Sequence, residues 1–247
     1  MHRSHVLAGL IALTISASPV AAQRGDGGAR GYLELAFVAA DPRGEFATYV
    51  DEGFGVQLTG RWQPDPSSWV SLRTDLGFIN YGNERFTFCS QFSCRLAFDL
   101  TTRNNIFYLG LGPEIEVPSP VLRPYAFAAV GLGYFATTSS LRGSSDFDDF
   151  ANTVNFDDAV LQWRAGGGVR VRLSGGDHPV ALDIGGEYHG NGEVEYLTEG
   201  DIVDNPDGSV TLFPIRSEAN LATFRIGVSI GFGDRSGERR GRRRHRH

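Results

Sequence analysis

The chain has 247 residues and a formal net charge of −6, from 29 acidic and 23 basic residues. All 23 basic residues are arginines, and seven of them lie between Arg235 and Arg246, so the rest of the chain is more acidic than the total suggests. This composition excludes a fold covered by a basic surface, and we expect no nucleic-acid partner. The length suits a single β-barrel domain.

The first 22 residues have the pattern of a secretory signal peptide. Arg3 lies near the start, residues 6–15 form an apolar core, and residues 17–22 end in the small pair Ala21-Ala22. We expect cleavage after Ala22, followed by a short N-terminal segment over 23–30. A retained membrane helix would need about 20 apolar residues, and this run is about half that length.

No later segment has the length and hydropathy of a membrane helix, but eight segments alternate between apolar and polar or small residues. The clearest is 161–173, where Leu161, Trp163 and Val169 alternate with Arg164 and Arg170. A period of two is typical of a β-strand with two different faces. The eight predicted strands lie at about 33–37, 54–63, 69–79, 107–114, 126–133, 161–173, 180–189 and 224–232.

The composition of the two faces favours a membrane barrel over a soluble β-sandwich or a lipocalin-like barrel. The apolar rows are nearly free of charge, and the opposite rows combine charged residues with many glycines, as a narrow barrel interior requires. Aromatic residues near the strand ends are expected to form girdles at the membrane interfaces. These residues are Trp62, Trp69, Tyr108, Tyr134, Trp163, Tyr188 and Phe232. We therefore predict an eight-stranded antiparallel transmembrane up-and-down β-barrel over 31–232.

The connections between the predicted strands alternate in length. The segments 64–68, 117–121 and 174–178 are short and rich in turn-forming residues. Long loops are expected at about 40–52, 80–103, 136–159 and 190–219, with a hairpin tip at 205–208. Short turns facing the periplasm and long loops facing outside are typical of outer-membrane barrels. Both ends of the barrel would then lie in the periplasm.

Two sequence runs resemble the OmpA-like and opacity-type small outer-membrane barrels. They are the run at 124–135 (PYAFAAVGLGYF) and the closing strand at 223–232 (TFRIGVSIGF). The resemblance covers nearly all of 31–232 and implies a place in the cell outer membrane of a Gram-negative-type bacterium. It also implies that the terminal aromatic Phe232 is the signal read by the barrel-assembly machinery. In this family the signal usually ends the chain or the barrel domain, whereas here residues 233–247 follow it and are expected to form an Arg-rich disordered tail.

The inward-facing row is predicted to hold a network of ion pairs that plugs the lumen. An eight-stranded barrel is just wide enough for side chains to fill its interior, and buried charges must pair. The alternative is a selectivity path for small solutes. The expected members are Glu34, Arg61, Arg73, Asp75, Glu114, Arg164, Arg170, Arg172, Asp183, Glu187 and Arg225, and Glu116 and His189 lie in the same row.

We expect no enzyme, cofactor or metal centre. Some eight-stranded outer-membrane barrels are lipid A deacylases with a His-x-Ser-Asn motif, but the corresponding residues here are His189, Gly190 and Asn191, without the serine. The acidic loop stretches favour solvated loops over a calcium site, since no complete calcium-binding repeat is present. Cys89 and Cys94 are expected to form a disulfide in an oxidising compartment, with free thiols as the alternative. This six-residue loop would contribute about 2 kcal/mol.

The predicted function is structural or surface-interacting, with a plugged lumen. The alternatives are a narrow passive channel for small solutes or hydrophobic molecules, similar to OmpW-like barrels, and a lipid A-modifying enzyme. The expected partners are outer-membrane lipid and lipopolysaccharide, the barrel-assembly machinery during biogenesis, and an extracellular ligand that contacts the long loops.

Overall fold

The structure is a computed structural model. It describes residues 29–65, 68–90, 93–143, 149, 151–176, 178–207 and 209–233, without the side chains of Phe88, Ser90 and residues 93–96. The predicted signal peptide and most of the Arg-rich tail lie outside these residues, so both stay predictions. Within the described part of the chain, no helix is long and apolar enough to cross a membrane.

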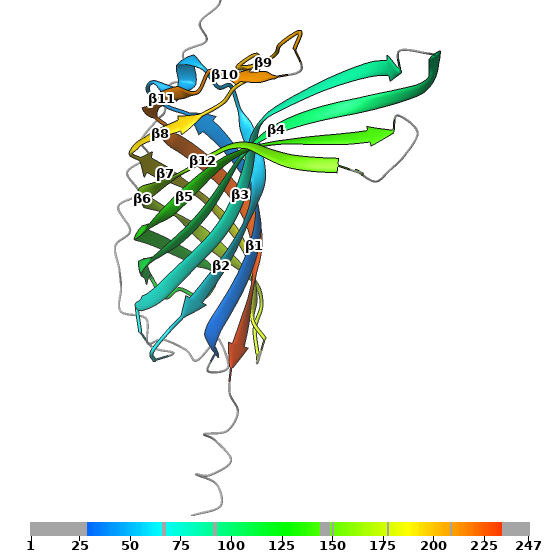
Figure 1. Cartoon of the computed structure of the whole chain (residues 1–247). Helices are drawn as coiled ribbons and strands as arrows, with labels where there is room; N and C mark the ends of the chain where they lie inside the picture. Colours follow the sequence, from blue (N-terminus) through cyan, green and yellow to red (C-terminus); the bar gives the residue numbers. More distant parts are fainter. Residues whose placement is uncertain are drawn as a thin grey trace, which may run out of the picture.

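Eight antiparallel strands form a closed barrel, in which each strand pairs with its neighbours in the chain and the first strand pairs with the last (Figure 1). This confirms the predicted fold class and strand number. The strands are β1 (Ala29–Pro42), β2 (Gly53–Trp62), β3 (Val70–Ser90), β4 (Ser93–Glu116), β5 (Leu122–Gly143), β6 (Ala151–Ser174), β7 (Val180–Asn191) and β12 (Leu221–Gly233).

The outer surface of the barrel is apolar and the lumen is polar over most of its length. Leu35, Leu109 and Leu161 point outward and are 62%, 50% and 78% exposed. On the alternate positions, side chains such as Arg73 and Glu114 are completely buried. A water-soluble fold would bury the apolar row, so this inverted arrangement is that of a barrel surrounded by lipid.

The predicted girdle aromatics lie on the outer face, with one exception. Tyr108 is 1% exposed and lies in the lumen, so its assignment to a girdle was wrong. Its ring occupies the space opposite Gly77, where an added Cβ would lie 2.0 Å from the ring carbon Cζ. Glycine at this position therefore makes room for a lumen aromatic. The error arose because the residue type was given more weight than the alternation, which places Tyr108 on the inner row.

Two of the four predicted long loops are in fact strands. β3 and β4 stay paired as far as Ser90↔Ser93, and β5 and β6 as far as Leu141↔Ala151, with β-bulges at Asn80/Gly82 and Thr137/Thr138. We call the four-stranded sheet of residues 82–90, 93–104, 137–143 and 151–155 the paddle. It projects sideways from the long-loop end of the barrel (Figure 1). Strands were predicted from an apolar row that alternates with a polar one. A sheet outside the lipid needs no such row, so residues 80–103 and 136–159 were predicted to be loops.

The remaining long connections fold into a small cap. The cap comprises residues 43–52 and 192–220 and includes the 3₁₀-helix η1 (Phe46–Thr48). Its strands are β8 (Glu193–Tyr196), paired with β11 (Ile215–Glu218), and β9 (Ile202–Asp204), paired with β10 (Val210–Leu212). The predicted hairpin tip is confirmed, since the backbone N–H of Asn205 donates to the carbonyl of Ser209 at 2.8 Å, although Gly208 lies outside the described residues.

The cap encloses an apolar cluster at the long-loop end of the barrel, which we call the apolar layer. The ring of Phe46 contacts that of Tyr196 edge-on, with centroids 5.0 Å apart. Inward-facing strand residues complete the cluster on the barrel side. They were not predicted from the sequence, because polar or small residues were expected on this inner row. The members are Val38, Ala40, Phe46, Val50, Ile79, Tyr81, Ile106, Tyr108, Phe135, Val194, Tyr196, Ala219 and Leu221.

Candidate functional site: the lumen network and the paddle

Buried ion pairs fill the lumen between the apolar layer and the short-turn end of the barrel. Ten of the eleven predicted network residues lie in this ion-pair layer, together with Glu116. Its five arginines and six carboxylates come from all eight strands of the barrel except β5, which contributes Tyr125 and Phe127. The ten are Glu34, Arg61, Arg73, Asp75, Glu114, Arg164, Arg170, Asp183, Glu187 and Arg225.

Arg170 is the centre of the lower half of the layer. Its NH1 donates to Glu114 Oε1 at 2.6 Å and to Glu116 Oε2 at 2.7 Å, and its Nε lies 3.1 Å from Asp183 Oδ2. The guanidinium lies 3.8 Å from the centroid of the Tyr125 ring. Since Tyr125 also donates to Asp183 at 2.8 Å, charge pairing and aromatic packing hold the same groups in place.

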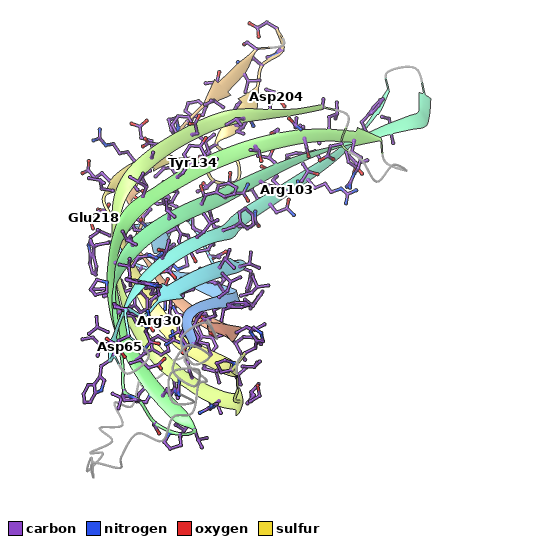
Figure 2. All side chains as sticks on the ribbon, turned by 90° about the horizontal axis from the view of Figure 1, so that it is seen from below. Arg30, Asp65, Arg103, Tyr134, Asp204 and Glu218 are labelled. Carbon is purple, nitrogen blue, oxygen red and sulfur yellow. The ribbon has the colours of Figure 1, made fainter. Side chains whose placement is uncertain are left out.

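Asp75 links this half to the upper half. Arg73 donates from Nε to Asp75 at 2.9 Å and from NH1 to Glu114 at 2.8 Å. Arg164 donates to Asp75 at 2.6 Å and to Glu187 Oε1 at 3.1 Å. The layer is therefore continuous across the barrel. Figure 2 shows the side chains from the short-turn side.

Arg172, the eleventh residue, is not buried with the others. Its side chain is half exposed at the short-turn end, and its Nε donates to the carbonyl of Ser174 at 3.2 Å. Alternation alone placed it inward, but β6 has a register shift between Arg172 and Ser174, where the sheet ends. Arg123, which the sequence did not single out, lies 3.5 Å from Glu116 at the same end.

Glu34 differs from the other carboxylates of the layer. It is 1% exposed, yet within the described part of the chain neither of its oxygens accepts a hydrogen bond. Its nearest charged partners are the Nε atoms of Arg170 at 3.6 Å and Arg225 at 3.9 Å. Glu34 is thus held by charge at longer range, whereas Glu114 accepts hydrogen bonds from three arginines.

His189 has a structural environment. Its Nε2 lies 2.7 Å from Glu187 Oε1, its Nδ1 lies 3.2 Å from the amide of Gln162, and its ring packs edge-on against Tyr108. The residue is completely buried in the lumen, away from the lipid face. Gln162, Tyr108 and the other uncharged polar partners of the layer were missed from the sequence, although the alternation already placed them on the inner row.

The short-turn end of the lumen leaves little space. A recess of about 20 Å³ lies among Tyr32, Arg61, Glu116 and Arg170, which is room for about one water molecule. Above it, Arg73, Asp75, Glu114 and Glu187 are between 0% and 5% exposed. Polar side chains and the apolar layer thus occupy successive levels of the same lumen.

The paddle carries the second group of charged residues. Its outer face, which continues the lipid-facing face of the barrel, holds Arg85, Asp99, Arg103 and Arg142. Cys89, near its tip, is disulfide-bonded, and the side chain of Cys94 lies outside the described residues, so the pairing of the two stays a prediction. No group of three or more potential metal ligands occurs among the described His, Cys, Asp and Glu residues.

Comparison with solved structures finds similar small barrels at low sequence identity. The attachment invasion locus protein Ail of Yersinia pestis is 10% identical with a TM-score of 0.46, covering 83% of this chain and 99% of that one. Neisserial surface protein A is 13% identical with a TM-score of 0.42, covering 85% and 100%. The N-terminal barrel of Pseudomonas aeruginosa OprF is 12% identical with a TM-score of 0.30, covering 85% and 100%.

No curated protein sequence matches the chain. A family profile described as "Outer membrane protein beta-barrel domain" matches residues 8–232, which is nearly the whole chain. The profile match, the closed barrel and its apolar outer surface agree, and the chain belongs to this family of outer-membrane β-barrel proteins.

Proposed function

We propose that this protein is a non-conducting barrel that anchors the paddle and the cap at the cell surface, a structural and surface-interaction role. In this orientation the short turns face the periplasm and the paddle and cap face outside. The single observation that supports the proposal is the double filling of the lumen. The ion-pair layer occupies the middle and the periplasmic side, and the apolar layer occupies the outer end.

The two layers oppose conduction for different physical reasons. An ion that entered the ion-pair layer would have to displace a guanidinium or a carboxylate from a buried pair, and breaking such a pair costs about 3–5 kcal/mol. The apolar layer is mostly hydrocarbon, and the hydroxyls of its three tyrosines are engaged in hydrogen bonds, so it offers little to replace the hydration shell of an ion. A small hydrophobic solute would be stopped by the charged layer instead, so the geometry supports neither type of passage.

An enzymatic role is not part of the proposal. His189 is buried between Glu187, Gln162 and Tyr108, where a lipid substrate has no access. We propose two partners for a barrel of this kind, the membrane lipid and the machinery that assembles it. The outer row of the barrel contacts lipid, and the barrel-assembly machinery reads Phe232, which is 48% exposed on the last strand.

Single-channel recording in planar bilayers tests the proposal. The purified, folded protein should give no steady unitary current over several hours at 100 mV, while a porin of known conductance inserted in the same bilayer calibrates the measurement. Folding is checked beforehand by heat-modifiable migration on unboiled gels. A steady unitary current from folded protein would overturn the closed lumen and support the channel alternative.

A further inference from the structure

Three arginines lie together on the outer face of the paddle. Along β4, Leu109 and Phe107 face the lipid, and Arg103 follows on the same face four residues beyond Phe107. Successive side chains of a strand alternate between faces, so residues an even number apart share a face. The cross-strand pairs Asn83↔Arg103 and Arg103↔Thr138 carry this face onto β3 and β5. The arginine face therefore begins where the lipid-facing row ends.

A buried carboxylate, Asp99, binds one of these arginines and lies opposite another across the sheet. Asp99 pairs across the sheet with Arg142 on one side and with Thr87 on the other. Thr87 donates to its Oδ1 at 2.6 Å and Arg85 binds its Oδ2, so that the hydrogen bond from Thr87 and the neighbouring arginine lower the pKa of Asp99. Asp99 is 2% exposed, whereas the side chain of Arg85 is 53% exposed. The acid is enclosed, and the guanidinium groups remain accessible.

The positive charge of the extracellular end is concentrated on this face. The cap is dominated by acids such as Glu193, Glu195 and Asp201, and its two arginines each pair with a carboxylate. Arg43 binds Asp41, and Arg216 lies 3.0 Å from Glu193. Among the described side chains of the paddle face, three arginines accompany one acid, Asp99, so positive charge exceeds negative charge in this part of the face. In a chain with a net charge of −6, this segregation needs a reason.

We infer that the outer face of the paddle binds the phosphate groups of lipopolysaccharide in the outer leaflet. The face lies directly above the lipid-facing row, at the level of the lipid headgroups, and its charge is opposite to theirs. The planar fork of arginine matches the geometry of phosphate oxygens. The inference names a partner for the proposed surface role, but it does not depend on whether the lumen is closed.

Native mass spectrometry of the full-length folded protein in detergent, titrated with purified diphosphoryl lipid A, tests this inference. The variant Arg85→Gln/Arg103→Gln/Arg142→Gln should bind diphosphoryl lipid A more weakly by on the order of tenfold. The matched control Arg43→Gln/Arg216→Gln, which removes two arginines from the cap, should change the affinity less than about twofold. Lipid A without phosphates should bind the wild type and the triple variant equally.

Equal binding of diphosphoryl lipid A by the wild type and the triple variant would overturn the inference. An equal loss in the cap control would do the same, since it would show a general charge effect. The variant Arg85→Lys/Arg103→Lys/Arg142→Lys retains the charge and should recover most of the affinity. If the glutamine triple variant does not migrate as a folded barrel, the three single variants are compared instead. This test does not measure conductance, so a negative result would leave the proposal of a closed lumen unaffected.

Discussion

Arginine occupies two contrasting environments in this barrel. In the lumen, Arg73 and Arg170 are completely buried, bind two or more carboxylates each and lie over aromatic rings. On the paddle, Arg85 binds one carboxylate and keeps half of its side chain exposed. Arginine therefore stabilises the fold where it is buried among several carboxylates, and it is available to a partner where its side chain is exposed to water. Since the residue type is the same in both places, the burial of the side chain is what distinguishes the two roles.

The largest expected effect comes from the most heavily paired carboxylate of the lumen. Glu114→Gln removes the negative charge among Arg61, Arg73 and Arg170 and should lower the free energy of unfolding by about 3–5 kcal/mol. Urea titration of the protein in lipid vesicles, followed by the unboiled-gel shift, measures this loss.

Glu34→Gln is the matched control for that prediction. The substitution is the same and the site is equally buried, but the carboxylate of Glu34 lies farther from its arginines. We expect a loss of less than about 1.5 kcal/mol. Equal losses in the two variants would contradict this prediction, because they would show that the hydrogen bonds from arginines to Glu114 do not determine its contribution to stability.

A smaller effect is expected in the apolar layer, and it should be confined to the cap. Phe46→Ala removes a buried ring that contacts Tyr81, Phe135 and Tyr196 and should cost about 3 kcal/mol of local stability, which detaches the cap from the barrel mouth. Limited proteolysis should then cleave within 197–214 faster than in the wild type.

The folded barrel of that variant should nevertheless survive, because the ion-pair layer lies below the cap. Its heat-modifiable migration should be unchanged and it should remain non-conducting. The exposed variant Phe213→Ala serves as the control for proteolysis. Loss of the folded band in Phe46→Ala would show that the two layers are not independent.

The smallest effect concerns a paddle carboxylate. Partial burial and the nearby Glu199 raise the pKa of Glu84, although a backbone hydrogen bond from Gly200 opposes the shift. A pKa that is raised on folding means that the protonated form is favoured in the folded state. The contact between β3 and residues 199–200 should then be stronger at low pH and weaken as the pH rises through the pKa of Glu84.

Amide hydrogen exchange at Gly200 measures this contact. After correction for intrinsic exchange, protection should fall by on the order of twofold between pH 4.5 and pH 7. Glu84→Gln should abolish this dependence. A pH dependence that persists in the glutamine variant would assign it to another group.

The barrel was predictable because lipid on one side and a narrow lumen on the other impose a strict alternation on every strand. The charged and apolar residues of 161–170 follow this rule, and Arg172, where the sheet ends, departs from it. The paddle was missed because strands such as 82–90 are exposed to water, where Asn, Thr and Arg are equally typical of loops. The apolar layer was missed for another reason. Ile79 and Ile106 are apolar on the inner row because the cap covers them, and the cap is built from two other parts of the chain, 43–52 and 192–220.

The composition of the ion-pair layer also has a consequence for how the barrel forms. Glu34 lies on the first strand and Arg225 on the last, and the two strands pair along most of their length. Arg225 also forms ion pairs with Asp183 and Glu187 on the neighbouring strand β7. Until β12 pairs with β1, Glu34 lacks Arg225 as one of its two nearby counter-ions inside a partly closed lumen. Closure of the ring and neutralisation of its interior should therefore occur as one cooperative step, which makes the open intermediate short-lived.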